Sequence, residues 1–179
     1  RGLMGAAMRE GDREAAHAHV LAAYQMNAKS PWVLEALFIL SCEMGQWGAA
    51  LDALRSQQKQ GKLKGAAYRR RRAVVLAAQA RQVAADGDAQ GAIGMAQASF
   101  RIAPDLSDNA VRLVGLLSEN GQARKARSVL DQALKAFPHP DLVALDREMA
   151  SGEKPAARVK RLDKLFTGEM IGDAARIEA

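Results

Sequence analysis

The eight residues ENGQARKA at positions 119–126 contain the pattern that decides the fold: a glycine, then a polar residue, then an alanine five residues after the glycine. The same pattern occurs in REGDREAA at 9–16, EMGQWGAA at 43–50 and ADGDAQGA at 85–92. The glycines are Gly11, Gly45, Gly87 and Gly121, so successive glycines are 34, 42 and 34 residues apart. Such self-similarity indicates a repeat protein, in which each repeat is one small unit of supersecondary structure.

Each glycine of this pattern predicts the end of one helix. Glycine adopts the left-handed conformation that closes a helix without a steric penalty. The alanine five residues later then lies where the two helices of a pair cross, and its small side chain lets the two backbones approach closely. These alanines are Ala16, Ala50, Ala92 and Ala126. The pattern therefore predicts antiparallel helix pairs.

The composition also favours helices over strands, because aromatic residues make up only 4% of the chain and no strand-like alternation is present. Prolines fall where a helix could begin or end, and Pro104 and Pro138 each follow a repeat glycine by 17 residues. We predict four helix pairs: 1–10 with 13–27, 32–44 with 47–60, 66–86 with 89–102, and 106–120 with 123–137. An atypical fifth pair is predicted at 141–150 with 155–166, followed by a tail.

The pattern over most of residues 1–138 resembles the tetratricopeptide repeat (TPR) family. Two of the three glycine intervals equal the 34-residue period of that family, and the third is eight residues longer. The resemblance implies an all-α, right-handed superhelix of antiparallel helix pairs. Residues 1–138 would form four TPR-like pairs, and residues 139–179 would add the atypical pair and the tail to the same solenoid.

Longer stretches resemble the C-terminal repeat region of the HemY family. They are SPWVLEALFILSCEMGQWGAALDAL, AAYRRRRAVVLAAQAR, APDLSDNAVRLVGLLSENGQARKARSVLDQALKAFPHPDL and EKPAARVKRLDKL. The resemblance implies the repeat part of a bacterial inner-membrane protein associated with a late step of haem biosynthesis, with its repeats on the cytoplasmic side. The chain begins with Arg1, so we expect a fragment without the two membrane helices of that family. The implied function is a non-enzymatic scaffold that binds other proteins, including haem-pathway enzymes.

Positive charge is concentrated in the middle of the chain. The net charge is +6, yet no acidic residue occurs between Asp52 and Asp86. That interval contains Arg55, Lys59, Lys62, Lys64, Arg69, Arg70, Arg71, Arg72 and Arg81. We expect this basic stretch, residues 55–81, to be able to lie against anionic lipid headgroups.

Four consecutive arginines begin the third predicted pair, and consecutive residues spread around a helix. We expect the eight extra residues to form a helix start that overhangs the packed part of the repeat, which would begin near Arg72. The arginines are then candidates for binding an anion, a tetrapyrrole or a lipid headgroup: Arg69, Arg70, Arg71 and Arg72. Pairing inside the chain, with Glu35 or Glu43, is the alternative.

The first helix of each pair lines the concave side of a repeat array, where partners usually bind. Repeat register predicts these inward-facing residues: Trp32, Glu35, Ile39, Cys42, Val74, Ala77, Arg81, Asp108, Val111, Arg112 and Ser118. Arg81 and Arg112 occupy nearly corresponding places in adjacent repeats, which predicts a clamp for an acidic peptide or a carboxylate. The alternative is that both arginines are solvated or pair with Glu119 and its neighbours.

Other functions have little support in the sequence. No catalytic triad, phosphate-binding glycine loop or zinc-ligand spacing is present, so we expect neither an enzyme nor a metal site. A direct haem or porphyrin carrier remains an alternative, with His139 or a methionine as the iron ligand, although a capping or solvent-facing role is the simpler interpretation of His139. A nucleic-acid-binding module is disfavoured, because Tyr68 is the only aromatic residue beside the arginines. Cys42 is expected to be a buried, inert thiol, and the oligomeric state stays open.

Overall fold

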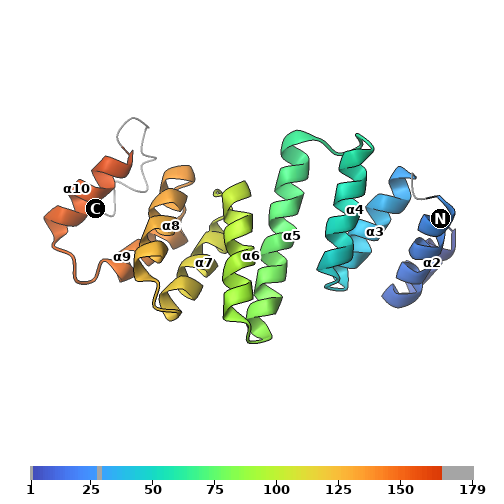
Figure 1. Cartoon of the computed structure of the whole chain (residues 1–179), viewed down its shortest axis with the longest axis horizontal. Coiled ribbons are helices and arrows are strands. Elements are labelled where there is room, and N and C mark those ends of the chain that lie inside the picture. Colours follow the sequence, from blue (N-terminus) through green and yellow to red (C-terminus); the bar gives the residue numbers. More distant parts are fainter. Residues whose placement is uncertain (1, 28–29, 167–179) are drawn as a thin grey trace. The chain divides into compact units, whose positions relative to one another are not determined.

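The structure is a computed structural model that describes residues 2–27 and 30–166, and over these residues every regular element is an α-helix (Figure 1). The helices are α1 (Gly2–Glu10), α2 (Arg13–Met26), α3 (Pro31–Glu43), α4 (Trp47–Lys59), α5 (Gly65–Ala85), α6 (Ala89–Ile102), α7 (Ser107–Glu119), α8 (Ala123–Ala136), α9 (Pro140–Met149) and α10 (Pro155–Phe166). The predicted all-α class is confirmed, and each predicted helix is present with its ends within one residue of the prediction.

The repeat glycines have the backbone conformation that the pattern predicted, and the repeat alanines are buried as it predicted. The four glycines have φ values of 76°, 68°, 89° and 71°, in the region that favours glycine. The four alanines are completely buried, at 0% exposure. In two of the turns an aspartate follows the glycine and caps the next helix: Asp12 accepts from the Ala15 N–H at 2.9 Å, and Asp88 from the Gly91 N–H at 2.8 Å.

The chain forms two compact units, Arg1–Gln79 and Ala80–Ala179, and the division falls within α5. In the first unit α1 packs on α2, α2 on α3, and α3 on α4. One apolar cluster joins these helices, with Val20 and Val33 at its centre. A second cluster joins α4 to the first part of α5 through Ala50, Leu54 and Val75.

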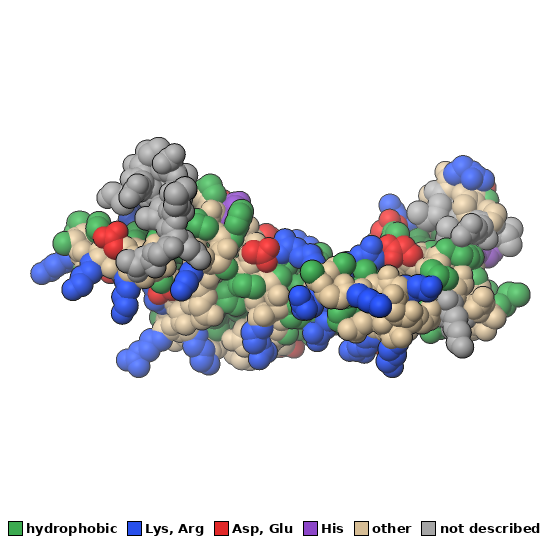
Figure 2. Space-filling model, turned by 90° about the horizontal axis from the view of Figure 1, so that it is seen from above, with side chains coloured by type: hydrophobic (Ala, Val, Ile, Leu, Met, Phe, Trp, Pro, Cys, Tyr) green, Lys and Arg blue, Asp and Glu red, His purple; other side chains and the backbone are tan. Residues whose placement is uncertain are grey.

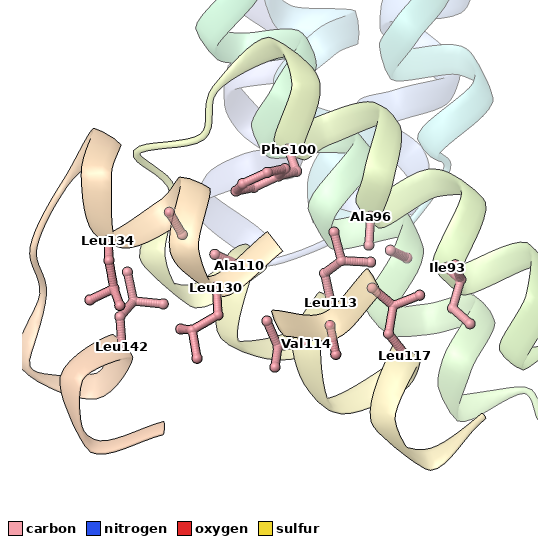
Figure 3. Packing of buried hydrophobic residues seen from close by; sticks show 13 residues of the cluster. Ile93, Ala96, Phe100, Ala110, Leu113, Val114, Leu117, Leu130, Leu134 and Leu142 are labelled. Carbon is pink, nitrogen blue, oxygen red and sulfur yellow. The ribbon is translucent and has the colours of Figure 1, made fainter. Parts of the chain in front are cut away.

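The second unit has a single larger core, shown in Figure 3. It runs from Ala80, at the end of α5, through α6, α7 and α8 to Leu142 on α9. Its leucines are at most 1% exposed: Leu113, Leu117, Leu130, Leu134 and Leu142. A buried hydrogen bond also joins α7 to α6, because Asn109 Nδ2 on α7 donates to the Ala96 carbonyl on α6 at 3.1 Å.

The eight extra residues of the third repeat lengthen α5. This helix has 21 residues, whereas α3 and α7 have 13 each. Eight residues add about 12 Å at the rise of an α-helix. The expected start of packing near Arg72 is wrong, because Leu63 and Tyr68 already pack against the cluster of Ala50, Leu54 and Val75.

The atypical fifth pair is formed by α9 and α10, which begin with Pro140 and Pro155. Proline is well suited to the first turn of a helix, where its missing N–H has no intrahelical partner. Helix α10 packs against α8, yet none of its described residues is fully buried. The predicted tail, residues 167–179, lies outside the described residues, and the predicted division at residue 138 stays a prediction.

Candidate functional site

Three charged residues among those predicted to face inward lie in the second unit, and two of them, Arg81 and Asp108, form an ion pair. Arg81 lies near the end of α5, Asp108 in the first turn of α7, and Arg112 one turn further along α7. Arg81 Nη1 is 3.7 Å from Asp108 Oδ2, and their side chains are 54% and 74% exposed. A pair so long and so exposed contributes little to stability. Neither arginine forms an ion pair with Glu119 in the described part of the chain, while the exposure of Arg81 agrees with the alternative of a solvated arginine.

Arg112 has an unsatisfied donor. Its Nε is buried and has no hydrogen-bond partner within residues 2–27 and 30–166. A buried donor without a partner costs about 1–3 kcal/mol, and more when the group is charged. Because Nε itself is closed off from solvent, a carboxylate of a partner would have to bind the other N–H groups of the Arg112 guanidinium, as the predicted clamp requires.

The first unit places its predicted residues differently. Arg71 Nη1 donates to Glu35 Oε2 at 2.7 Å and Oε1 at 3.0 Å, and the guanidinium lies 5.3 Å from the centre of the Phe38 ring. Gln57 Nε2 also donates to Glu35 Oε2, at 3.2 Å. Glu35 is thus used inside the unit, and pairing within the chain is the alternative that the structure shows for Arg71. The overhang predicted for Arg71 is wrong.

The apolar members of the predicted face in this unit are partly open. Ile39 is 44% and Val74 49% exposed, and Trp32 is half-buried. Cys42 was expected to be buried but is half-buried, because it lies at the edge of the second cluster. Burial raises the pKa of the Cys42 thiol, against the opposing charge of Arg71, so the thiol stays protonated near neutral pH.

The remaining cations gather where α4 ends and α5 begins. We call this group the basic tip, and its members are Lys59, Lys62, Lys64, Arg69, Arg70 and Arg72. Figure 2 looks down onto this end of the two helices, just right of its centre, and shows Lys and Arg side chains spread over it. Arg55 is excluded from the group because it pairs with Asp52 at 2.8 Å.

A network of three arginines and three carboxylates, which the sequence analysis missed, joins α8, α9 and α10. Asp146 on α9 is 1% exposed and accepts from Arg127 on α8, while Arg158 and Arg161 on α10 approach it at 3.0 and 2.8 Å. Arg161 also reaches Asp131 at 3.3 Å and Glu153 at 3.1 Å. The three positive and three negative charges cancel, so the network holds α10 against α8 and α9 without adding net charge.

The two aspartates of the network have opposite pKa shifts. Burial alone would raise the pKa of Asp146, but the hydrogen bond from Arg127 and the charges and hydrogen bonds of Arg161 and Arg158 lower it overall. Burial raises the pKa of Asp131, only partly offset by Arg127 and Arg161. The pKa of Arg161 is raised by Glu153 and Asp146, despite its own burial. Asp146 is therefore the member that depends most on its arginines.

A signal for this network was present in the sequence. Leu142 and Asp146 are four residues apart and share one face of α9, so an acidic residue continues the buried face. Arg158 and Arg161, three residues apart, likewise share a face of α10. A charged residue on an apolar face needs partners, because an unpaired buried charge is costly.

His139 is a capping residue. It precedes α9, and its Nδ1 accepts from the Asp141 N–H at 3.3 Å. Its ring lies 6.0 Å from that of Phe137, centre to centre. The capping interpretation is therefore the one that the structure shows.

Features of a metal site or a membrane span do not occur in the part of the chain that the structure describes. No group of three His, Cys, Asp or Glu side chains within residues 2–27 and 30–166 is placed to hold a metal ion. None of the described helices combines the length and apolar character needed to cross a bilayer. A pocket of about 220 Å³ lies between the end of α9 and α10, lined by Arg147, Ala150, Ser151, Glu153, Pro155, Arg158, Val159 and Leu162.

Comparisons with known proteins found a matching family model and similar solved structures. Residues 83–147 match the family model described as Tetratricopeptide repeat. The crystal structure of MamA is similar, with a TM-score of 0.51 and 13% identity over 92% of this chain and 91% of that one, which shows the fold alone. A thermophilic TPR protein of Thermus thermophilus is 17% identical over 98% of this chain and 92% of its own, with a TM-score of 0.37. A search of curated proteins found no match.

Proposed function

Because residues 83–147 match tetratricopeptide repeats in a chain of antiparallel helix pairs, we propose that this protein is a non-enzymatic scaffold that binds other proteins. Repeat proteins of this kind bind partners on the surface made by successive helices. The observation that carries the proposal is the long, exposed ion pair between Arg81 and Asp108, with Arg112 one helical turn beyond Asp108 in the matched segment.

The partner segment would carry a carboxylate. Charge-assisted hydrogen bonds between arginine and carboxylate are strong and geometrically specific. An incoming carboxylate would accept from Arg112 and displace Asp108 from Arg81. The exchange costs little, because the Arg81–Asp108 pair is 3.7 Å long and exposed. An Asp- or Glu-containing segment, or the C-terminus of another chain, fits this site.

Photo-crosslinking tests this proposal. A crosslinkable residue replaces Ser118, which is exposed on α7, or Ala136, which is exposed on α8 and serves as the control position. We expect a specific crosslinked protein from position 118 alone, identified by mass spectrometry. The crosslink should be lost in Arg81→Gln/Arg112→Gln and retained in the charge-matched control Arg101→Gln/Arg124→Gln. A crosslink that survives the first double substitution would contradict the proposed clamp.

The resemblance to the HemY family supports a finer version of this proposal. We propose that the scaffold serves a late step of haem biosynthesis at the cytoplasmic side of a bacterial inner membrane, and that its partners are haem-pathway enzymes. The support is the similarity of the quoted stretches, including the arginine run and residues 103–142. The same crosslinking experiment tests it, because the captured protein would then be an enzyme of that pathway.

Direct haem binding fits the structure poorly. Arg71 is held by Glu35 and covered by Phe38, and Nδ1 of His139 accepts a backbone hydrogen bond. Arg70 points away from the face that Arg69 and Arg72 share, because consecutive residues of a helix are about 100° apart, so the arginine run does not present its cations on one face. We therefore assign no haem chemistry to these residues. A titration with haem and with protoporphyrin is expected to give no saturable Soret shift. A saturable shift that is lost in Arg69→Gln/Arg72→Gln would instead support a haem or porphyrin carrier.

A further inference from the structure

The basic tip is a second surface, separate from Arg81, Asp108 and Arg112, and it suggests a different kind of partner. We propose that the basic tip binds the surface of an anionic lipid bilayer. The proposal does not depend on the proposed clamp, because the two surfaces share no residue.

Three cations of the tip are presented outward and are not neutralised by the described part of the chain. Lys62, Lys64 and Arg69 are exposed, and none of them forms an ion pair within the described residues. No acidic residue occurs between Asp52 and Asp86. Two nearby arginines with internal partners, Arg55 and Arg71, lie on the helix surfaces and pair with Asp52 and Glu35. The charge of the three cations is therefore concentrated at the end of the helical hairpin.

The tip is held in place by its own anchors. Leu63 and Tyr68 pack into the cluster formed by Ala50, Leu54 and Val75. The Lys62 N–H donates to the Gln57 carbonyl at 2.9 Å, and the Leu63 N–H donates to the same oxygen at 3.3 Å. A turn closed in this way presents its lysines without first having to become ordered, which lowers the entropic cost of binding.

Small residues between the cations let a surface approach closely. Gly61 and Gly65 have φ values of 69° and 54°, and they shape the turn. Ala66 and Ala67 are exposed at the start of α5. Positive charge at a helix N-terminus opposes the helix dipole. A negatively charged surface at this end would relieve that repulsion.

The chemistry of the tip favours a bilayer over other polyanions. Single-stranded nucleic acid is bound by aromatic stacking, and Tyr68, the aromatic residue beside the arginines, is half-buried in the core. Protein hot spots are aromatic or arginine side chains in packed pockets, whereas the tip is the outer end of a hairpin. An anionic bilayer needs only dispersed positive charge, and each Lys or Arg near it strengthens binding about fivefold.

Vesicle sedimentation of the 179-residue chain tests the proposal. The vesicles contain phosphatidylcholine alone or phosphatidylcholine with phosphatidylglycerol. The test variant is Lys62→Gln/Lys64→Gln/Arg69→Gln, and the control variant Arg101→Gln/Arg124→Gln/Lys135→Gln removes the same charge from exposed positions elsewhere. We expect binding to the anionic vesicles only, weakened roughly tenfold or more in the test variant and far less in the control. Thermal unfolding should be alike for all three proteins.

Other outcomes would overturn the proposal. Equal losses in the test and control variants would show that net charge, not the tip, governs binding. Displacement by inorganic phosphate, but not by chloride at equal ionic strength, would show a discrete phosphate site in place of a bilayer surface. Wild-type chain that ignores the vesicles but binds duplex DNA or RNA through Lys62, Lys64 and Arg69 would identify nucleic acid as the partner.

Discussion

Helices α8 and α10 pack against each other in the same unit, yet they are held in different ways. Helix α8 buries Ala126, Leu130, Ala133 and Leu134. Helix α10 fully buries none of its described residues and depends on Arg158 and Arg161, which reach Asp146, Asp131 and Glu153. Apolar burial is non-directional, whereas an ionic network depends on geometry, pH and its immediate partners. The comparison predicts that the last helix can be released while the core of the unit remains folded.

The largest effect is expected from removing an apolar anchor of α8. Leu130 is 0% exposed and belongs to the same core as Leu113 and Leu142. Leu130→Ala should destabilise the unit by about 3–5 kcal/mol, because it leaves a cavity. Urea unfolding followed by circular dichroism measures the change, with Val129→Ala at a half-buried neighbour as the control. A cost no larger than that of the control would contradict the role of α8 as the apolar anchor.

Removing the centre of the ionic network should cost less and act more locally. Asp146→Ala leaves Arg127, Arg158 and Arg161 without their shared acceptor, and we expect a loss of about 3 kcal/mol. The loss is at the lower limit for a buried ion pair, because the arginine side chains keep 21–24% exposure and water partly solvates them.

Hydrogen exchange distinguishes this local effect from global unfolding. Amides of α10 should exchange faster in Asp146→Ala, while those of α6 and α7 keep their protection. Asp163→Ala, at an exposed position of α10, is the control. Uniform loss of protection in all helices would show that α10 is not held separately.

The contrast between α8 and α10 also shows which features could be predicted from the sequence. The ends of α8, its turn at Gly121 and the buried Ala126 follow from a local pattern, because helix closure and close crossing depend on residues near each other in the chain. The partners of Asp146 lie on two other helices, 12 to 19 residues away. Residue types and spacing do not specify how α10 rotates toward α9, so the network could not be assigned.

The candidate sites show the same limit. Glu35 was named as one of two partners for the arginine run, but the sequence did not specify which arginine would reach it. The eight extra residues extend α5, and its rotation brings Arg71 to Glu35 and Phe38 while Arg69 stays exposed. Arg81 and Arg112 were placed by repeat register alone, and the buried Nε of Arg112 became visible only with the packing of α7.

The pH dependence of stability should separate the two aspartates of the network. The pKa of Asp146 is lowered in the folded state, so its stabilisation is present above its unfolded pKa and is lost as the pH falls through the folded pKa. The pKa of Asp131 is raised, so the folded state takes up its proton first, and acidification through that range favours folding. On acidification, protonation of Asp146 therefore lowers the stability of the folded state, whereas protonation of Asp131 raises it.

Unfolding free energies measured from about pH 7 to about pH 3 test this assignment. Asp146→Asn should flatten the loss of stability on acidification, and Asp131→Asn should make that loss steeper. Asp163→Asn is again the control and should leave the slope unchanged. If the unfolding free energy fell with pH at the same slope in the two variants, the opposite pKa shifts would be contradicted.

A smaller effect is expected at the ion pair of the first unit. Arg71 and Glu35 are 37% and 40% exposed, so solvent screens their attraction, although the two hydrogen bonds are short. A double-mutant cycle with Arg71→Gln and Glu35→Gln should give a coupling of about 1 kcal/mol. The same cycle with Arg55 and Asp52, which are more exposed, should give less. Equal couplings would show that exposure does not decide the strength of these pairs.

The smallest effect is expected at Arg81 and Asp108, and it bears most directly on function. Their separation of 3.7 Å and their exposure predict a coupling below about 0.5 kcal/mol in a double-mutant cycle with Arg81→Gln and Asp108→Asn. A weak pair is what the clamp requires, because a partner's carboxylate must replace Asp108. A coupling as large as that between Arg71 and Glu35 would make Asp108 a fixed ligand of Arg81. Arg112 would then remain as the arginine open to a partner in this group, and the proposed two-arginine clamp would fail.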